Sequence, residues 1–128
     1  MFDAIGKLQE LQAGLEAGKE HIGDEISAQQ SAMDAIESPG VLEAKTKLLV
    51  AIGAIALARC DNCVVLHMPK LVAVGATKDE VMEAAAVAIS FGGGPTMAFI
   101  STVIAPAYDQ FAAAAAAGDG YHAGGLFD

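Results

Sequence analysis

Residues 48–58, LLVAIGAIALA, form about three helical turns without a polar side chain. A helix that is apolar on every side belongs in the interior of a fold. The run is too short to cross a bilayer, which takes about 20 residues, so other helices must cover it. It predicts a central helix that begins near residue 42, ends near residue 58 and is buried all round.

The rest of the chain is predicted to form the helices that cover this central helix. Apolar residues recur at three- and four-residue steps in residues 2–15 and 22–36, as one stripe of an amphipathic helix does. Further helices are expected at residues 60–74, from 77 to about 91, and from 95 to about 117. Few segments alternate polar and apolar residues with period two. The sequence therefore predicts an all-α bundle of about six helices.

Short motifs mark where these helices begin and end. Thr77-Lys78-Asp79-Glu80 is typical of a capping box, and Gly75 before it suits the end of the preceding helix. The run Gly92-Gly93-Gly94-Pro95 should end one helix and place Pro95 in the first turn of the next. Such a run can also cradle an anion, although a sharp turn between packed helices accounts for it as well.

The expected organisation has three parts. Residues 1–20 form an N-terminal helix, residues 21–117 a helical domain, and residues 118–128 a flexible tail with four glycines. We expect no boundary inside the helical domain.

Composition and charge narrow the choice of partners. Hydrophobic residues make up 54% of the 128 residues before the 14 glycines are counted, whereas an ordinary soluble domain reaches about 45–50% with glycine included. A single small domain has too little interior for this surplus, so we expect a homo-oligomer. The formal net charge is −9, with seven scattered basic residues, which argues against nucleic acid and acidic membranes as partners.

No membrane segment or leader is expected. Residues 84–108 are uncharged and long enough to span a bilayer, but the glycine–proline run divides them into two short halves. The chain opens Met1-Phe2-Asp3, without the basic start of a leader. We therefore expect a cytoplasmic protein, in which two neighbouring cysteines indicate redox or metal chemistry rather than a structural bridge.

Both cysteines lie in the segment ARCDNCVVLH. On a helix Cys60, Cys63 and His67 share one face, and His67 is an i,i+4 neighbour of Cys63. Asp61 and Asn62 favour helix starts over helix interiors. We therefore expect a helix to begin at the cysteines, where the two sulfurs can close a disulfide.

This placement favours thiol chemistry. A thiol at a helix N-terminus meets the positive end of the helix dipole, which lowers its pKa, and Arg59 would add to this effect. His67 can take a proton from a thiol or give one to a leaving group. A thiol pair with a base beside it suits redox chemistry in which one thiolate attacks and the other resolves.

Core packing and metal binding also stay open as roles for the cysteines. Free cysteines pack well in cores. Cys60, Cys63 and His67 would supply three of the four ligands that structural zinc takes, but His21 and His122 lie in regions without ligand spacing. We expect neither a metal nor a cofactor.

With these features the chain resembles the carboxymuconolactone decarboxylase family, and within it the AhpD-like (alkylhydroperoxidase D-like) branch. The resemblance covers about residues 22–110. It rests on residues 42–52 (LEAKTKLLVAI), on CDNC with His67, on the turn at Gly75 with the acidic helix start after it, and on the GGGP run. It implies an all-α fold that assembles as trimers or hexamers, with peroxidase-like activity in the redox branch.

The resemblance also implies roles for the site residues. Cys63 would be the peroxidatic thiol that attacks a hydroperoxide, Cys60 the resolving thiol, and His67 part of a proton relay. A small dithiol or a protein reductant would then re-reduce the pair. Arg59 and Asn62 are candidates for supporting residues.

The chain departs from this branch in its relay. Leu48 stands where members usually carry a glutamate, and Asn62 stands where they carry a histidine. Only His67 of the relay remains, so part of an acid–base contribution that is typically about 10²–10⁴-fold is lost.

The sequence therefore predicts a thiol-dependent oxidoreductase that reduces peroxides in the manner of peroxiredoxins or exchanges disulfides. Two alternatives stay open. One is a lyase similar to the decarboxylases that give the family its name. The other is a non-catalytic oligomeric redox sensor, which is consistent with leucine at the position of the relay glutamate.

Overall fold

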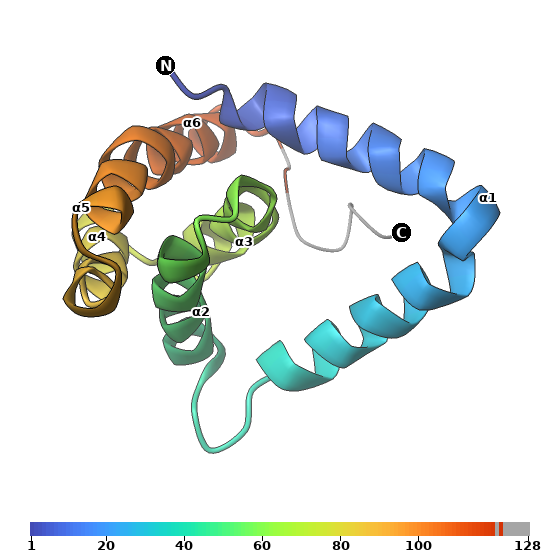
Figure 1. The fold of residues 1–128 in the computed structure, drawn as a ribbon, viewed down its shortest axis with the longest axis horizontal. Helices are drawn as coiled ribbons and strands as arrows, with labels where there is room; N and C mark the ends of the chain where they lie inside the picture. Colours follow the sequence, from blue (N-terminus) through green and yellow to red (C-terminus); the bar gives the residue numbers. More distant parts are fainter. Residues whose placement is uncertain (120, 122–128) are drawn as a thin grey trace.

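The computed structural model describes residues 1–119 and 121, and the regular secondary structure in this part of the chain is all helical. The elements, shown in Figure 1, are α1 (Ala4–Glu37), α2 (Ala44–Ala58), α3 (Asp61–Ala73), α4 (Lys78–Ala86), α5 (Ile89–Phe99), the π-helical segment η1 (Ile100–Ile104) and α6 (Ala105–Ala116). The predicted all-α class with about six helices is confirmed. Most of the tail predicted for residues 118–128, including His122, lies outside the described residues.

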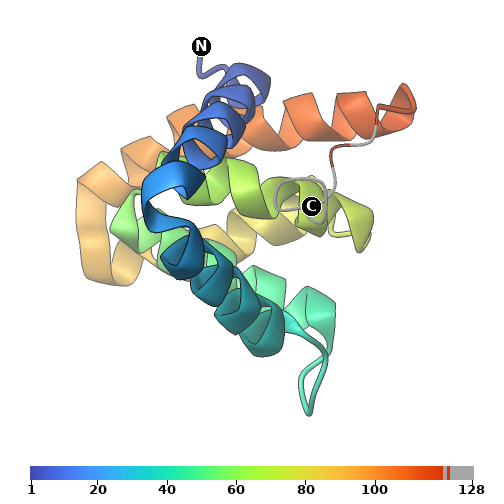
Figure 2. The same ribbon diagram turned by 90° about the vertical axis from the view of Figure 1, so that its right-hand side faces the viewer.

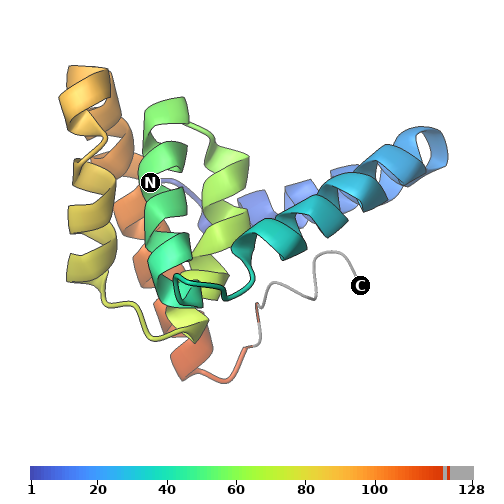
Figure 3. The ribbon, with the colours of Figure 1, turned by 90° about the horizontal axis from the view of Figure 1, so that it is seen from below.

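Helix α2 lies at the centre of the helical body. Figure 3 shows it between α4 and α3, and its contacts to these two helices are extensive. Leu48, Ile52 and Ile55 of α2 are buried, and they share one core with Met68 of α3 and Phe111 of α6. Removing these side chains from water is the main force that holds α2 in place.

One side of α2 remains open, so the prediction that this helix is buried all round is wrong. Val50 is 65% exposed and Leu57 is 45% exposed. Together with Phe91, which is 79% exposed, they line an apolar groove of about 540 Å³ between α2, α4 and α5. The apolar surplus of the sequence therefore lies partly on the surface of the single chain.

Helix α1 leaves the body and returns to it as two arms (Figures 1 and 2). Ile22 has non-helical dihedrals, φ −131° and ψ 39°, and the helix changes direction there. The two helices predicted for residues 2–15 and 22–36 are thus both present, and they meet directly at this kink because the first continues to residue 21. We call residues 4–21 of α1 the first arm and residues 23–37 the return arm. The buried residues of α1, Ala4 and Leu8, belong to the first arm.

The turn between α2 and α3 confirms that a helix begins at the cysteines. Arg59 caps α2 in the left-handed conformation, with φ 52° and ψ 46°. Cys60 then takes the extended conformation of an N-cap, and α3 starts at Asp61. The direction of the chain thus reverses within two residues, and the cysteines lie at the N-terminal end of α3.

The capping box of α4 is confirmed, but the helix is shorter than predicted. The Thr77 side chain accepts the Glu80 N–H at 3.1 Å, and the Glu80 carboxylate accepts the Thr77 N–H at 2.9 Å. The helix ends at Ala86 rather than near residue 91. Hydrogen bonds from residue i+3 to residue i tighten the chain at Ala88, so a turn separates α4 from α5.

The glycine run breaks the helix inside α5, as predicted. Gly93 has φ 65° and ψ −148°, a backbone region that is essentially restricted to glycine. The chain then resumes a helical path through Pro95 and continues into η1 and α6. In the described residues, no helix has both the length and the hydropathy that crossing a membrane requires.

The break gives a matched pair of substitutions. A Cβ added at Gly93 or at Gly94 meets no atom within 4 Å, but only Gly93 has a positive φ. Gly93→Ala should therefore lower the free energy of unfolding by about 1–3 kcal/mol through backbone strain alone. Gly94→Ala should leave it unchanged or raise it by less than about 1 kcal/mol. Urea unfolding of both variants checks this, and equal effects would contradict it.

Candidate active site

The two cysteines form a disulfide at the start of α3. The Cα atoms of Cys60 and Cys63 are 5.2 Å apart, which is within the range that a bridge accepts. The Cys63 N–H points at the Cys60 sulfur at 3.1 Å. In this oxidised form the pair therefore lies directly at the helix N-terminus, where backbone N–H groups would stabilise a thiolate after reduction.

Charged and polar residues surround the pair on the solvent side. Arg59 and Asn62 are exposed and lie next to the cysteines in the chain. Asp61 accepts the Asn62 N–H at 2.8 Å, and Lys7 of α1 lies 3.7 Å from the other Asp61 oxygen. Lys7 and Asp61 thus join the first arm of α1 to the start of α3.

His67 is buried one turn after Cys63. Its Nδ1 lies 2.9 Å from the Cys63 carbonyl oxygen. Because a carbonyl oxygen only accepts hydrogen bonds, Nδ1 carries a proton and donates it. Its Nε2 faces a carboxylate oxygen of Glu37, at the end of α1. Both ring nitrogens therefore have partners in the oxidised form.

Glu37 is the site residue that sequence reasoning missed. One of its carboxylate oxygens bonds to His67, and the other accepts a hydrogen bond from Lys70 Nζ at 2.8 Å. The Glu37 side chain is 17% exposed. The residue lies 30 positions before His67, so no spacing rule connects the two. Its position immediately before the Ser38-Pro39-Gly40 helix stop was the available signal.

Electrostatics keep this carboxylate ionised. Burial by itself would raise the pKa of Glu37. The hydrogen bond from Lys70 and the charges of His67 and Lys70 outweigh burial and hold the pKa below its ordinary value of 4.5. Glu37 is therefore an anion at neutral pH.

Leu48 is a core residue in this structure. It is 4% exposed and packs in the hydrophobic core. The carboxylate that the family resemblance placed at this position is thus absent from α2. The one beside His67 comes from α1 instead.

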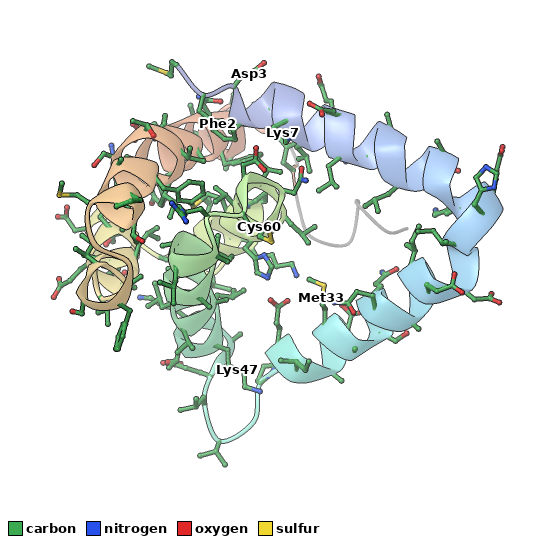
Figure 4. All side chains as sticks on the ribbon, in the orientation of Figure 1. Phe2, Asp3, Lys7, Met33, Lys47 and Cys60 are labelled. Atoms are coloured by element: carbon green, nitrogen blue, oxygen red, sulfur yellow. A yellow bond between two sulfur atoms is a disulfide. The ribbon has the colours of Figure 1, made fainter. Side chains whose placement is uncertain are left out.

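Lys47 fixes the end of the return arm. Its Nζ donates to the Ile36 carbonyl at 2.9 Å and to the Ser38 carbonyl at 2.8 Å. These carbonyls flank Glu37 in the last turn of α1, where a cation is favourable. Figure 4 shows Lys47 at the junction of the return arm and the loop to α2.

An apolar groove opens beside the disulfide. It has a volume of about 440 Å³ and lies between the two arms of α1 and the first turns of α3. Cys63 and Leu66 form one wall, and the opposite walls include Leu15, Ile26 and Met33. Figure 4 shows Met33 pointing into the space between the return arm and α3. The partly exposed Cys63 is thus accessible from an apolar surface.

Metal-ligating side chains do not cluster in residues 1–119 and 121. Within this part of the chain, no group of three or more histidine, cysteine, aspartate or glutamate side chains is arranged to hold a metal ion. His21 is exposed on α1, and His122 lies outside the described residues.

Known proteins resemble this chain in sequence and in fold. The carboxymuconolactone decarboxylase family matches residues 28–106. An uncharacterised protein of Cupriavidus necator is 34% identical over 80 residues, which are 62% of this chain and 71% of that protein. The resemblance to this family that was inferred from the sequence is thus confirmed.

Two solved structures share the fold. One is a carboxymuconolactone decarboxylase family protein of Legionella pneumophila, with a TM-score of 0.79, 24% identity, and coverage of 85% of this chain and 96% of that one. The other is a Thermotoga maritima protein of the same family, described as a candidate for the antioxidative response. It has a TM-score of 0.74, 24% identity, and coverage of 88% and 96%.

The lowered pKa of Glu37 predicts a pH-dependent contribution to stability. Because the folded pKa lies below the ordinary value of 4.5, the contribution is complete above about pH 4.5 and is lost as the pH falls through the folded pKa. Glu37→Gln should lower the free energy of unfolding by about 2 kcal/mol at pH 7, and by clearly less at pH 3. Urea unfolding at both pH values measures this.

Glu20→Gln is the control for this prediction. It makes the same change of charge at an exposed position on the same helix, so it should change stability by less than about 0.5 kcal/mol. A Glu37→Gln effect that stays constant between pH 7 and pH 3 would contradict the assignment of the ion pair.

Proposed function

The chain belongs to the carboxymuconolactone decarboxylase family, and we propose that within this family it is a thiol-dependent oxidoreductase that reduces peroxides or exchanges disulfides. The observation that carries the proposal is the Cys60–Cys63 pair at the N-terminus of α3, with Cys63 on the wall of an open apolar groove. A helix N-terminus favours the thiolate, and the thiolate is the nucleophile in both reactions.

In peroxide reduction Cys63 attacks first. Its thiolate forms a bond to one peroxide oxygen, the O–O bond breaks, and the departing alkoxide takes a proton to become an alcohol. Cys63 is then a sulfenic acid. The Cys60 thiol attacks the Cys63 sulfur, the S–S bond forms and hydroxide leaves as water. The dithiol has given two electrons to the peroxide, and the product is the disulfide present in this structure.

Reduction of the disulfide completes the cycle. A thiolate of an external dithiol attacks one sulfur of the pair, the S–S bond breaks and a mixed disulfide forms. The second thiol of the reductant then resolves it, so the reductant leaves oxidised. The same steps without peroxide constitute disulfide exchange. His67 lies one turn from Cys63 and is the acid–base group for these proton movements.

We also propose that the protein acts as a homo-oligomer, as a trimer or a hexamer. Val50, Leu57 and Phe91 form an apolar surface on the single chain, and surfaces of this kind in soluble proteins mark contacts with partners.

The likeness to the Thermotoga maritima protein, a candidate for the antioxidative response, supports the peroxide branch of the proposal.

Intact-mass measurement tests the reaction. The fully reduced protein, freed of reductant, receives one equivalent of an organic hydroperoxide and is quenched within seconds. The wild type should lose the mass of two hydrogen atoms, mapped to a Cys60–Cys63 bond. Cys60→Ser should instead gain one oxygen atom on Cys63, because no thiol resolves the sulfenic acid. Cys63→Ser should stay unchanged.

The controls separate the two branches of the proposal. An unchanged wild-type mass would exclude peroxide reduction, and addition of a small disulfide in place of the peroxide then tests exchange alone. Equal oxidation of both single cysteine variants would reject the assignment of Cys63 as the attacking thiol. A protein that reacts once, and is not turned over when a dithiol is supplied, would be a sensor rather than an enzyme.

A further inference from the structure

We propose that Glu37 is the positioning residue of the thiol site: it orients His67 and holds the proton that the site uses. This inference rests on the proposed function and adds a residue from α1 to it. The motif CxxC with a following histidine lies entirely in and before α3, whereas Glu37 comes from the last turn of the helix that precedes α2.

The hydrogen bonds of His67 determine where its protons are. Nδ1 donates to the Cys63 carbonyl, so it is not free to accept. Nε2 faces the Glu37 carboxylate, which at neutral pH has no proton of its own to give. The proton between the two groups therefore lies on Nε2, which donates it to the Glu37 carboxylate. Without a carboxylate here, Nε2 would have no acceptor to hold that proton.

Few other charged groups reach this pair. In residues 1–119 and 121, the charged side chain that bonds to the pair is Lys70 of α3, through the second Glu37 oxygen. Lys7 and Asp61 pair with each other at the start of α3. On α2, Leu48 offers no charge at the position of the relay glutamate. Glu37 is thus the carboxylate through which the site can bind and release a proton.

The proton that His67 donates to Glu37 fits the needs of the reaction. When the O–O bond breaks, the His67–Glu37 pair gives this proton to the departing alkoxide, and the proton that the Cys63 thiol releases takes its place. When Cys60 attacks the sulfenic acid, the pair gives a proton to the departing hydroxide, and the Cys60 thiol proton replaces it. The pair therefore returns to its starting state after each step.

The placement of Glu37 depends on the return arm. Lys47 binds the carbonyls on both sides of Glu37 in sequence, Ile36 and Ser38, and so fixes the backbone from which the carboxylate reaches His67. The return arm has no buried residue of its own. Its end is therefore held by polar contacts, and these contacts also assemble the proton site.

The first test is independent of activity. In the oxidised protein, ¹⁵N NMR of the His67 ring reports which nitrogens carry protons. In Glu37→Gln, Nε2 should shift toward the position of an unprotonated, accepting nitrogen, because the glutamine amide donates to it. In Glu20→Gln the His67 signals should stay in place. An unchanged Nε2 signal in Glu37→Gln would overturn the proposal.

The second test follows the rate at which the reduced protein forms its disulfide with an organic hydroperoxide. Glu37→Gln should be about 10²-fold slower near neutral pH. Glu37→Asp, which keeps the charge on a shorter stem, should recover part of the rate, and Glu20→Gln should match the wild type. Circular dichroism establishes that each variant is folded. A Glu37→Gln rate within twofold of the wild type would also overturn the proposal.

The two tests separate this inference from the proposed function. If the wild type forms no disulfide with peroxide, peroxide reduction fails, and the same variants are compared in disulfide exchange. If the wild type reacts but Glu37→Gln reacts equally fast, the thiol chemistry stands and the role of Glu37 is wrong.

Discussion

The burial of one side of α2 determines where the neighbouring helices pack. Leu48, Ile52 and Ile55 need apolar partners, and α3 and α4 supply them from opposite sides. For α3 to lie against α2, the chain must reverse at once, and the left-handed Arg59 followed by the extended Cys60 makes that reversal. The position of the cysteines at a helix start is thus a consequence of packing. The apolar force that builds the core also sets the electrostatic environment of the thiols.

Features fixed by neighbours in sequence were the ones that sequence could predict. The capping box at Thr77, the helix start at Cys60 and the break in the glycine run each depend on a few adjacent residues. The early end of α4 and the continuity of α1 through residues 16–21 depend on how whole helices pack, so local patterns did not reveal them. The sequence did not predict the exposed side of α2 for the same reason, because periodicity shows that a face is apolar without showing what covers it.

The candidate site also combines residues that are close in sequence with one that only the packing of helices brings near. Cys60, Cys63 and His67 lie at the N-cap and in the first two turns of α3, and their spacing in the sequence predicts that they share one face of the helix. Glu37 reaches His67 only because α1 bends at Ile22 and returns. A carboxylate can accept a hydrogen bond from an imidazole whichever helix carries it. Leucine at position 48 therefore shows only that α2 lacks the group, and the folded chain presents one from another direction.

Glu37 lies outside the CxxC motif, and this affects how the sequences of related proteins are compared. Two chains could share the fold, the CxxC pair and the following histidine, and still differ in chemistry because of one residue 30 positions upstream. A comparison confined to the motif would group them together. On the role proposed for Glu37, such chains would divide by whether a carboxylate ends the first helix and whether a lysine follows the histidine by three residues, as Lys70 does here.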